Sequence, residues 1–77
     1  MQRKHPHLVK LGQQIRKIRE SKGFSQEEFA AEAELDRSYM GGVERGERNI
    51  STLNLIRIAK ALKVEVGKLF PNINKLR

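Results

Sequence analysis

Residues 25–46 read SQEEFAAEAELDRSYMGGVERG, and this stretch decides the fold. Ser25 followed three residues later by Glu28 is a capping box, which marks the start of a helix. Asp36 is a second helix-capping residue. Only a few residues around 33–36 join the two predicted helices, which is too short a link for a relaxed antiparallel pair. The spacing therefore predicts a helix-turn-helix, in which two short helices cross steeply through a tight turn.

Further helices are predicted on both sides of this stretch. Before it, apolar residues recur at helical spacing and end at Gly23, a residue typical of the position just past a helix. After it, Ser51 caps a fourth helix, and residues 64–70 can form a short fifth helix that Pro71 ends. No segment alternates as a strand would. The apolar positions behind these assignments are Leu8, Leu11, Ile15, Ile18, Leu53, Ile56, Ala59 and Leu62.

The expected fold is all-α, a compact five-helix bundle that contains the helix-turn-helix. With 77 residues the chain has room for one domain. We expect a flexible N-terminal arm over residues 1–7 and a helix-turn-helix domain over residues 8–70, with its motif at about 25–45. Residues 71–77 would form a short tail. Because only four residues are aromatic, the core must be aliphatic.

Composition excludes several classes of protein. The chain has no cysteine, so neither disulfides nor thiolate metal sites are available. His5 and His7 stand in the arm without further ligands, and we therefore expect no metal and no cofactor. No apolar run reaches the roughly 20 residues of a membrane span, and the N-terminus lacks the apolar stretch of a signal peptide. These absences predict a cytoplasmic protein without a membrane partner.

The charge balance favours an anionic partner. Sixteen Lys and Arg residues against nine Asp and Glu residues give a net charge of +7. The acidic segment 23–36 stands between basic segments, which indicates a charged folded surface rather than a polybasic tail. Catalysis is not favoured, because no serine has a histidine placed to act as its base. The acidic residues also lack a Gly-rich loop or a metal-ligand spacing.

Three short motifs resemble the phage-repressor and Xre-type helix-turn-helix family. They are SQEEFA at 25–30, LDRSY at 35–39 and VERG at 43–46, and the likeness extends over residues 8–70. Within this family, LDRSY and the segment ERGERN at 44–49 most resemble the controller proteins of restriction–modification systems. The resemblance implies a homodimeric, sequence-specific transcriptional regulator that binds a palindromic operator in double-stranded DNA. It also implies both activation and repression of the protein's own restriction–modification operon.

The resemblance makes the third predicted helix the recognition helix, whose first residues face base edges in the major groove. Arg37 carries a fork of donors that suits guanine, Ser38 can donate or accept, and Tyr39 offers a hydroxyl or an apolar face. Gly41 and Gly42 would let the groove wall approach the backbone, and a loose helix end is the alternative for them. We predict base reading by these five residues.

Phosphate contacts are expected from donors around the two helices of the motif. Gln26 corresponds to the phosphate-binding glutamine of the family. Arg48 and Asn49 match donors that controller proteins direct at DNA, and Arg45 flanks the same exit from the third helix. An ordinary polar loop is the alternative for these last three residues, above all for Arg45.

Two charged residues stand at the edges of core-facing stripes. Arg19 follows Ile15 by four residues and Glu44 follows Met40 by four, so both need partners. The resemblance joins them in an ion pair between the first and third helices, which would hold the recognition helix without touching DNA. Glu34 stands where the family usually has glycine. If φ is positive there, the turn stores on the order of 1 kcal/mol of strain.

A second copy of the chain is the other expected partner, because one short domain reads too few bases. Apolar residues near the C-terminus exceed the evident needs of the core, and we predict a dimer interface at Val66, Leu69, Phe70 and Ile73. RNA polymerase remains open as a further partner. The alternative function is a phage-type repressor, or an antitoxin-like DNA-binding protein whose main partner is another protein. An RNA-binding adaptor would need stacking aromatic residues, and only Tyr39 could serve.

Overall fold

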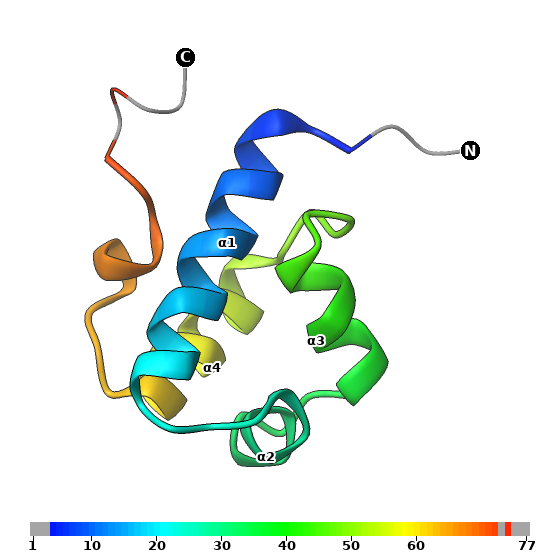
Figure 1. The fold of residues 1–77 in the computed structure, drawn as a ribbon, viewed down its shortest axis with the longest axis vertical. Coiled ribbons are helices and arrows are strands. Elements are labelled where there is room, and N and C mark those ends of the chain that lie inside the picture. The colour runs from blue at the N-terminus through cyan, green and yellow to red at the C-terminus, as the bar shows by residue number, and fades with distance from the viewer. Residues whose placement is uncertain (1–3, 73, 75–77) are drawn as a thin grey trace.

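The computed structural model describes residues 4–72 and 74, which contain helices but no strand (Figure 1). The four α-helices are α1 (Pro6–Ser21), α2 (Gln26–Glu32), α3 (Arg37–Glu44) and α4 (Thr52–Leu62). A 3₁₀-helix, η1 (Val66–Leu69), follows them. The predicted all-α fold is confirmed, with a 3₁₀-helix in place of the fifth α-helix.

Helix α1 begins earlier than predicted. It starts at Pro6, whereas the sequence placed both Pro6 and His7 in the N-terminal arm. Proline suits the first helical position because its φ is already helical and its missing N–H would have no partner there. His5 caps the helix, since its Nδ1 accepts a hydrogen bond from the backbone N–H of His7 at 3.1 Å. At the other end, Gly23 takes a φ of +84°, as expected of the residue after a helix.

Helix α2 begins with the predicted capping box. Ser25 Oγ accepts a hydrogen bond from the backbone N–H of Glu28 at 3.0 Å. In return, Glu28 Oε1 accepts from the backbone N–H of Ser25 at 2.9 Å, and this bond lowers the pKa of the Glu28 carboxyl. The rings of Phe24 and Phe29 meet edge to face with centroids 5.5 Å apart. Phe29 is buried in the core, so this contact packs the capped end of α2 against the core.

The turn between α2 and α3 contains the strained residue that the sequence suggested. Glu34 has a φ of +58°, in the left-handed region where a side chain is unfavourable. The backbone N–H of Leu35 donates to the carbonyl of Ala30 at 2.8 Å and closes the turn. Asp36 then caps α3 by accepting from the backbone N–H of Ser38. This short closed turn sets the steep crossing of the two helices.

The last two elements also depend on local signals. Ser51 caps α4 by accepting from the backbone N–H of Asn54 at 3.1 Å, as predicted. Helix α4 ends at Leu62, and the next residue, Lys63, has a φ of +59°. The segment 64–70 was expected to be α-helical, but only Val66–Leu69 is helical, and it is a 3₁₀-helix. Four residues are too few for a stable α-helical turn without a cap, and this one has no side-chain cap.

Helices α1 and α3 pack unusually closely at Gly12. A Cβ added to Gly12 would lie 2.4 Å from the carbonyl oxygen of Val43 and 2.7 Å from that of Glu44. Contacts this short are not possible, so only glycine allows the α1 backbone to approach α3 this far. In Figure 1 the two helices lie side by side above α2, and α4 passes behind α1.

The core is aliphatic except for Phe29, as composition suggested. Leu69 belongs to it: its exposed fraction is 0%, because η1 packs against both α1 and α4. The prediction that Leu69 lies at a dimer interface is therefore wrong. The buried hydrophobic residues are Leu11, Ile15, Phe29, Ala30, Ala33, Met40, Val43, Ile50, Ile58, Ala59, Leu62 and Leu69.

Candidate nucleic-acid interface

The beginning of α3 presents exposed polar side chains. Arg37, its first residue, is exposed and pairs with no residue among those described. Ser38 is also exposed, but its hydroxyl donates to Asp36 Oδ1 at 3.0 Å. Bonds from the backbone and hydroxyl of Ser38 lower the pKa of the Asp36 carboxyl. Of these residues, Arg37 has the donors most available to a ligand.

Tyr39 is half-buried rather than fully presented to solvent. Its hydroxyl oxygen accepts a hydrogen bond from Asn54 Nδ2 at 3.1 Å. The guanidinium carbon of Arg48 lies 5.6 Å from the centre of the Tyr39 ring, within the range of a cation–π contact. Tyr39 thus joins α3 both to α4 and to the segment that follows α3.

Gly41 and Gly42 are buried beneath longer side chains instead of facing open solvent. A Cβ on Gly41 would lie 3.0 Å from Arg45 Nη1 and 3.3 Å from Gln26 Oε1. A Cβ on Gly42 would lie 3.1 Å from Arg48 Nε. The alternative of a loose helix end is wrong, because both residues lie within α3. Their missing side chains make room for Gln26, Arg45 and Arg48, three of the residues predicted to contact phosphate.

Arg45 is already paired within the chain. Its Nε and Nη2 donate to the two carboxylate oxygens of Glu47 at 3.0 and 3.1 Å. The hydrogen bonds from Arg45 lower the pKa of Glu47, and they raise the pKa of Arg45 in turn. Lys4 Nζ lies 3.8 Å from the same carboxylate. A phosphate that binds Arg45 must therefore compete with Glu47, whereas the exposed Asn49 makes no side-chain bond to a described residue.

A buried polar network holds α3 against α1 and α2. Arg19 Nε donates to Glu44 Oε2 at 2.6 Å and Arg19 Nη2 donates to Glu44 Oε1 at 3.0 Å. Arg19 Nη1 donates to the carbonyl of Phe24 at 2.7 Å. Gln26 Nε2, at the start of α2, donates to Glu44 Oε1 at 3.0 Å. The hydrogen bonds to Glu44 raise the pKa of Arg19.

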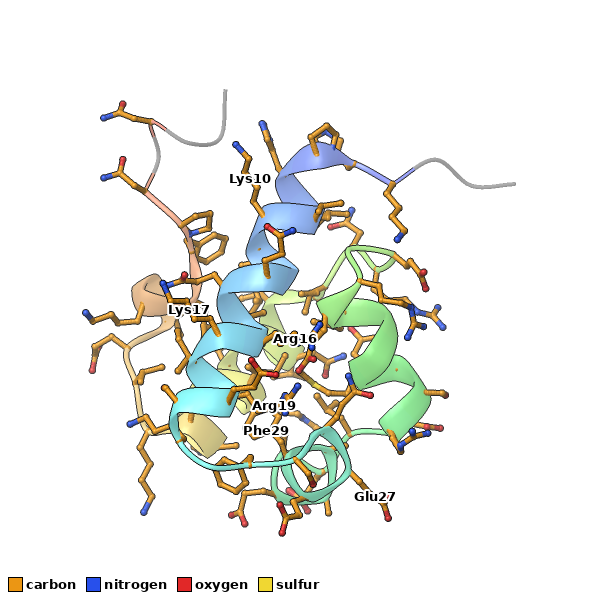
Figure 2. The ribbon with its side chains drawn as sticks, viewed as in Figure 1. Lys10, Arg16, Lys17, Arg19, Glu27 and Phe29 are labelled. Carbon is orange, nitrogen blue, oxygen red and sulfur yellow. The ribbon has the colours of Figure 1, made fainter. Side chains whose placement is uncertain are left out.

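The two charged residues of this network are buried, so their role is structural. Arg19 and Glu44 are only 6% and 8% exposed, so neither is available to DNA. Figure 2 shows Arg19 directed inward from α1 near Phe29, while Glu27 lies on the outside of α2. Gln26 is half-buried and donates only one of its two amide N–H groups to Glu44, which leaves the other for a ligand.

A separate set of exposed apolar residues lies on α4, on η1 and at Phe70 just after η1. Leu53 is 63% exposed, Ile56 39%, Val66 37% and Phe70 43%. The sequence predicted Val66 and Phe70 as interfacial but did not separate Leu53 and Ile56 from the core positions of α4. Ile73, also predicted, lies outside the described residues. Because helical periodicity alone could not show which apolar stripe of α4 is covered, no sequence signal distinguished these two residues.

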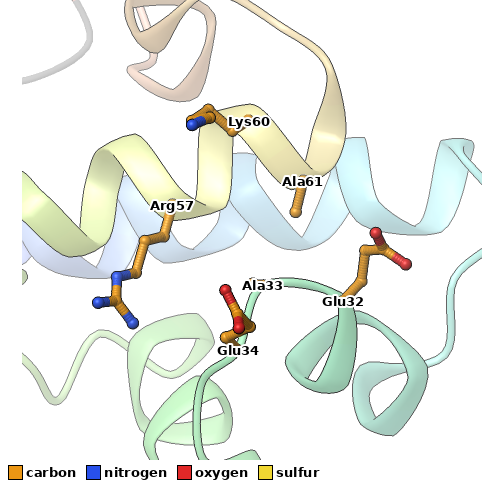
Figure 3. Close-up of a pocket in the computed structure, with 6 residues that line it drawn as sticks. All are labelled: Glu32, Ala33, Glu34, Arg57, Lys60 and Ala61. Atoms are coloured by element: carbon orange, nitrogen blue, oxygen red, sulfur yellow. The ribbon is translucent and has the colours of Figure 1, made fainter.

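An open cleft lies between the α2–α3 turn and α4 (Figure 3). Its walls carry acidic residues from the end of α2 and from the turn, and basic residues from α4. No ion pair joins the two sides in the described part of the chain. The lining residues are Glu32, Ala33, Glu34, Arg57, Lys60 and Ala61.

Among the described residues, no group of three or more His, Cys, Asp or Glu could hold a metal ion. No helix of the described chain has the length and apolar character to cross a membrane.

Comparison with known proteins identifies relatives of this arrangement. The profile of the helix-turn-helix family matches residues 15–69. The control protein C.MunI of a Mycoplasma species is 40% identical over 87% of this chain and 92% of its own length. The crystal structure of the restriction–modification controller protein C.AhdI from Aeromonas hydrophila matches 82% of this chain and 96% of its own with a TM-score of 0.80 and 54% identity. SinR, a master regulator of biofilm formation solved in complex with DNA, matches 77% of this chain and 95% of its own with a TM-score of 0.74 and 35% identity.

Proposed function

Because this chain belongs to the helix-turn-helix family, with relatives among the controller proteins of restriction–modification systems, we propose that it controls transcription from such an operon. It binds an operator in double-stranded DNA as a homodimer and regulates its own expression. One observation carries the proposal: Arg37 is exposed and unpaired among the described residues, at the start of a helix that a buried ion pair holds in place. A helix held in this way can present the donors of its first side chain to a base edge.

Base reading begins at Arg37. Its guanidinium can donate two parallel hydrogen bonds to O6 and N7 of a guanine. Ser38 and Tyr39 follow in the same turn, and each must share its hydroxyl with a bond already made inside the chain. Gly41 and Gly42 support reading indirectly, because they leave space for the side chains that flank the groove.

Phosphate contacts come from the edges of the motif. Gln26 offers its second amide N–H beside the start of α2, and the exposed Arg48 and Asn49 follow α3. Arg45 joins them only where phosphate displaces Glu47. These contacts fix the position of the protein on the duplex, while the side chains at the start of α3 read sequence.

A second copy of the chain covers the apolar surface of α4 and η1. This surface consists of Leu53, Ile56, Val66 and Phe70. A twofold dimer formed there would bind half-sites about 34 Å apart, one helical turn of DNA. Light scattering should show a dimer, and Ile56→Lys should shift it toward the 8.9 kDa monomer. A monomer at all micromolar concentrations, with and without DNA, would contradict the dimer.

The protein is a regulator rather than an enzyme, and it works in the cytoplasm, where the operator lies. Its partners are the operator, a second copy and, where it activates transcription, RNA polymerase. Selection of bound duplexes from a random pool tests the proposal. We expect a palindrome whose half-sites are about 10 base pairs apart, centre to centre. Equal affinity for the selected duplex and a scrambled duplex at the same salt concentration would overturn sequence-specific regulation.

A further inference from the structure

Asn54 connects α4 to the recognition helix. Its backbone N–H donates to Ser51 Oγ at 3.1 Å, which fixes the first turn of α4. From this fixed position its side-chain Nδ2 donates to the hydroxyl oxygen of Tyr39 at 3.1 Å. Both side chains are half-buried. We propose that Asn54 is a positioning residue for DNA recognition, acting through Tyr39, an inference that rests on the proposed function.

The direction of this hydrogen bond determines what Tyr39 can offer to DNA. The amide nitrogen of Asn54 can only donate, so the phenol oxygen of Tyr39 acts as the acceptor. The hydroxyl proton of Tyr39 is then free to be donated to a phosphate or to an acceptor on a base edge. Without Asn54, the Tyr39 ring loses the bond that restricts its rotation, and part of the binding free energy would be needed to order it again.

The ring of Tyr39 also contacts Arg48, so Asn54 influences the position of Arg48 through this ring. The guanidinium carbon of Arg48 lies 5.6 Å from the centre of the Tyr39 ring. Nearer its own backbone, the Arg48 side chain lies close to Gly42, where an added Cβ would be 3.2 Å from Arg48 Cγ. Arg48 therefore lies close both to the ring of Tyr39 and to α3 at Gly42. A contact made by α4 thus sets the positions of two side chains predicted to meet DNA.

A double-mutant cycle between Asn54→Leu and Tyr39→Phe tests this inference. The assay measures affinity for the duplex selected by the wild-type protein. Asn54→Leu should lower that affinity about three- to tenfold, the range expected for one net hydrogen bond. In the Tyr39→Phe background, which has no hydroxyl to position, Asn54→Leu should have no further effect. The inference is overturned if Asn54→Leu leaves the wild-type affinity unchanged, or if its loss is equally large in both backgrounds.

A second measurement needs no DNA, so it separates this inference from the proposed function. Tyr39 is the only tyrosine and the chain has no tryptophan, so tyrosine fluorescence reports on this site alone. Time-resolved anisotropy should show faster local motion of Tyr39 in Asn54→Leu than in the wild type, with circular dichroism confirming an intact fold. Asn54→Ala should show the same faster local motion of Tyr39. An unchanged local motion in both variants would show that Asn54 does not position Tyr39, whatever the protein binds.

Discussion

Arg19 of α1 and Glu44 of α3 form a buried ion pair, with Arg19 Nε 2.6 Å from Glu44 Oε2. The pair is the centre of a network that also includes the carbonyl of Phe24 and the amide of Gln26. It therefore joins α1, the loop before α2, the start of α2 and the end of α3. The network thus holds α3 against α1 and α2, in addition to the short turn that links α2 to α3.

Removing one member of this pair should leave a buried charge without its partner. We expect Arg19→Met and Glu44→Met each to lower the free energy of unfolding by about 3–5 kcal/mol. The double variant, which leaves no lone charge, should lose less than the sum of the two single changes. Urea denaturation of all four proteins measures the coupling. Additive losses would show that the two residues do not interact energetically.

Gly12 is expected to resist replacement by alanine. Gly12→Ala places a Cβ against the backbone of α3, and backbone cannot move aside as a flexible side chain can. The variant should be destabilised by about 1–3 kcal/mol, as overpacked sites are. Gly67→Ala is the matched control, because a Cβ there meets nothing within 4 Å. Thermal unfolding compares the two, and equal stability of Gly12→Ala and the wild type would refute the close approach.

Glu34 should be replaceable by glycine with a gain in stability. Its φ of +58° strains any residue that carries a Cβ, so Glu34→Gly should raise the free energy of unfolding by about 1 kcal/mol. Glu32→Gly is the control, since it removes the same side chain from the last residue of α2. That change should destabilise the protein, because glycine disfavours helical backbone. Denaturant midpoints decide the matter, and a lower midpoint for Glu34→Gly contradicts the strain.

Arg37 and Arg48 should differ in what they contribute to DNA binding. Arg37→Ala should cost about 1–3 kcal/mol on the operator and flatten the preference at one base pair per half-site. Arg37→Lys restores the charge but not the fork of donors, so much of the discrimination should stay lost. Arg48→Ala should weaken binding to operator and random duplex more equally.

Salt titrations separate the two roles. A lost phosphate contact should reduce the slope of log K against log[salt] by about one, and Arg48→Ala should show this reduction. Titrations against single-base operator variants then measure base preference. If Arg37→Ala kept full base preference while Arg48→Ala lost it, the assignment of Arg37 as the reading residue would be wrong.

The sequence predicted those parts of the fold that depend on neighbouring residues. The caps at Ser25, Asp36 and Ser51 were visible because a side chain bonds to backbone two or three residues away. The sequence prediction missed the start of α1, because Pro6 can begin a helix as well as interrupt one. The ion pair of Arg19 with Glu44 was expected from two core-edge charges and from the family resemblance together.

The class of fold, the caps of its helices and the resemblance to controller proteins followed from the sequence alone. Only the tertiary structure decided which surfaces remain free. It placed Leu69 in the core and left Ile56 exposed, although both are apolar residues in helical segments. It also paired Asn54 with Tyr39 and placed Arg48 over the ring. The reason is physical: caps and periodicity act between neighbours in the chain, whereas burial and side-chain pairing depend on how distant helices pack.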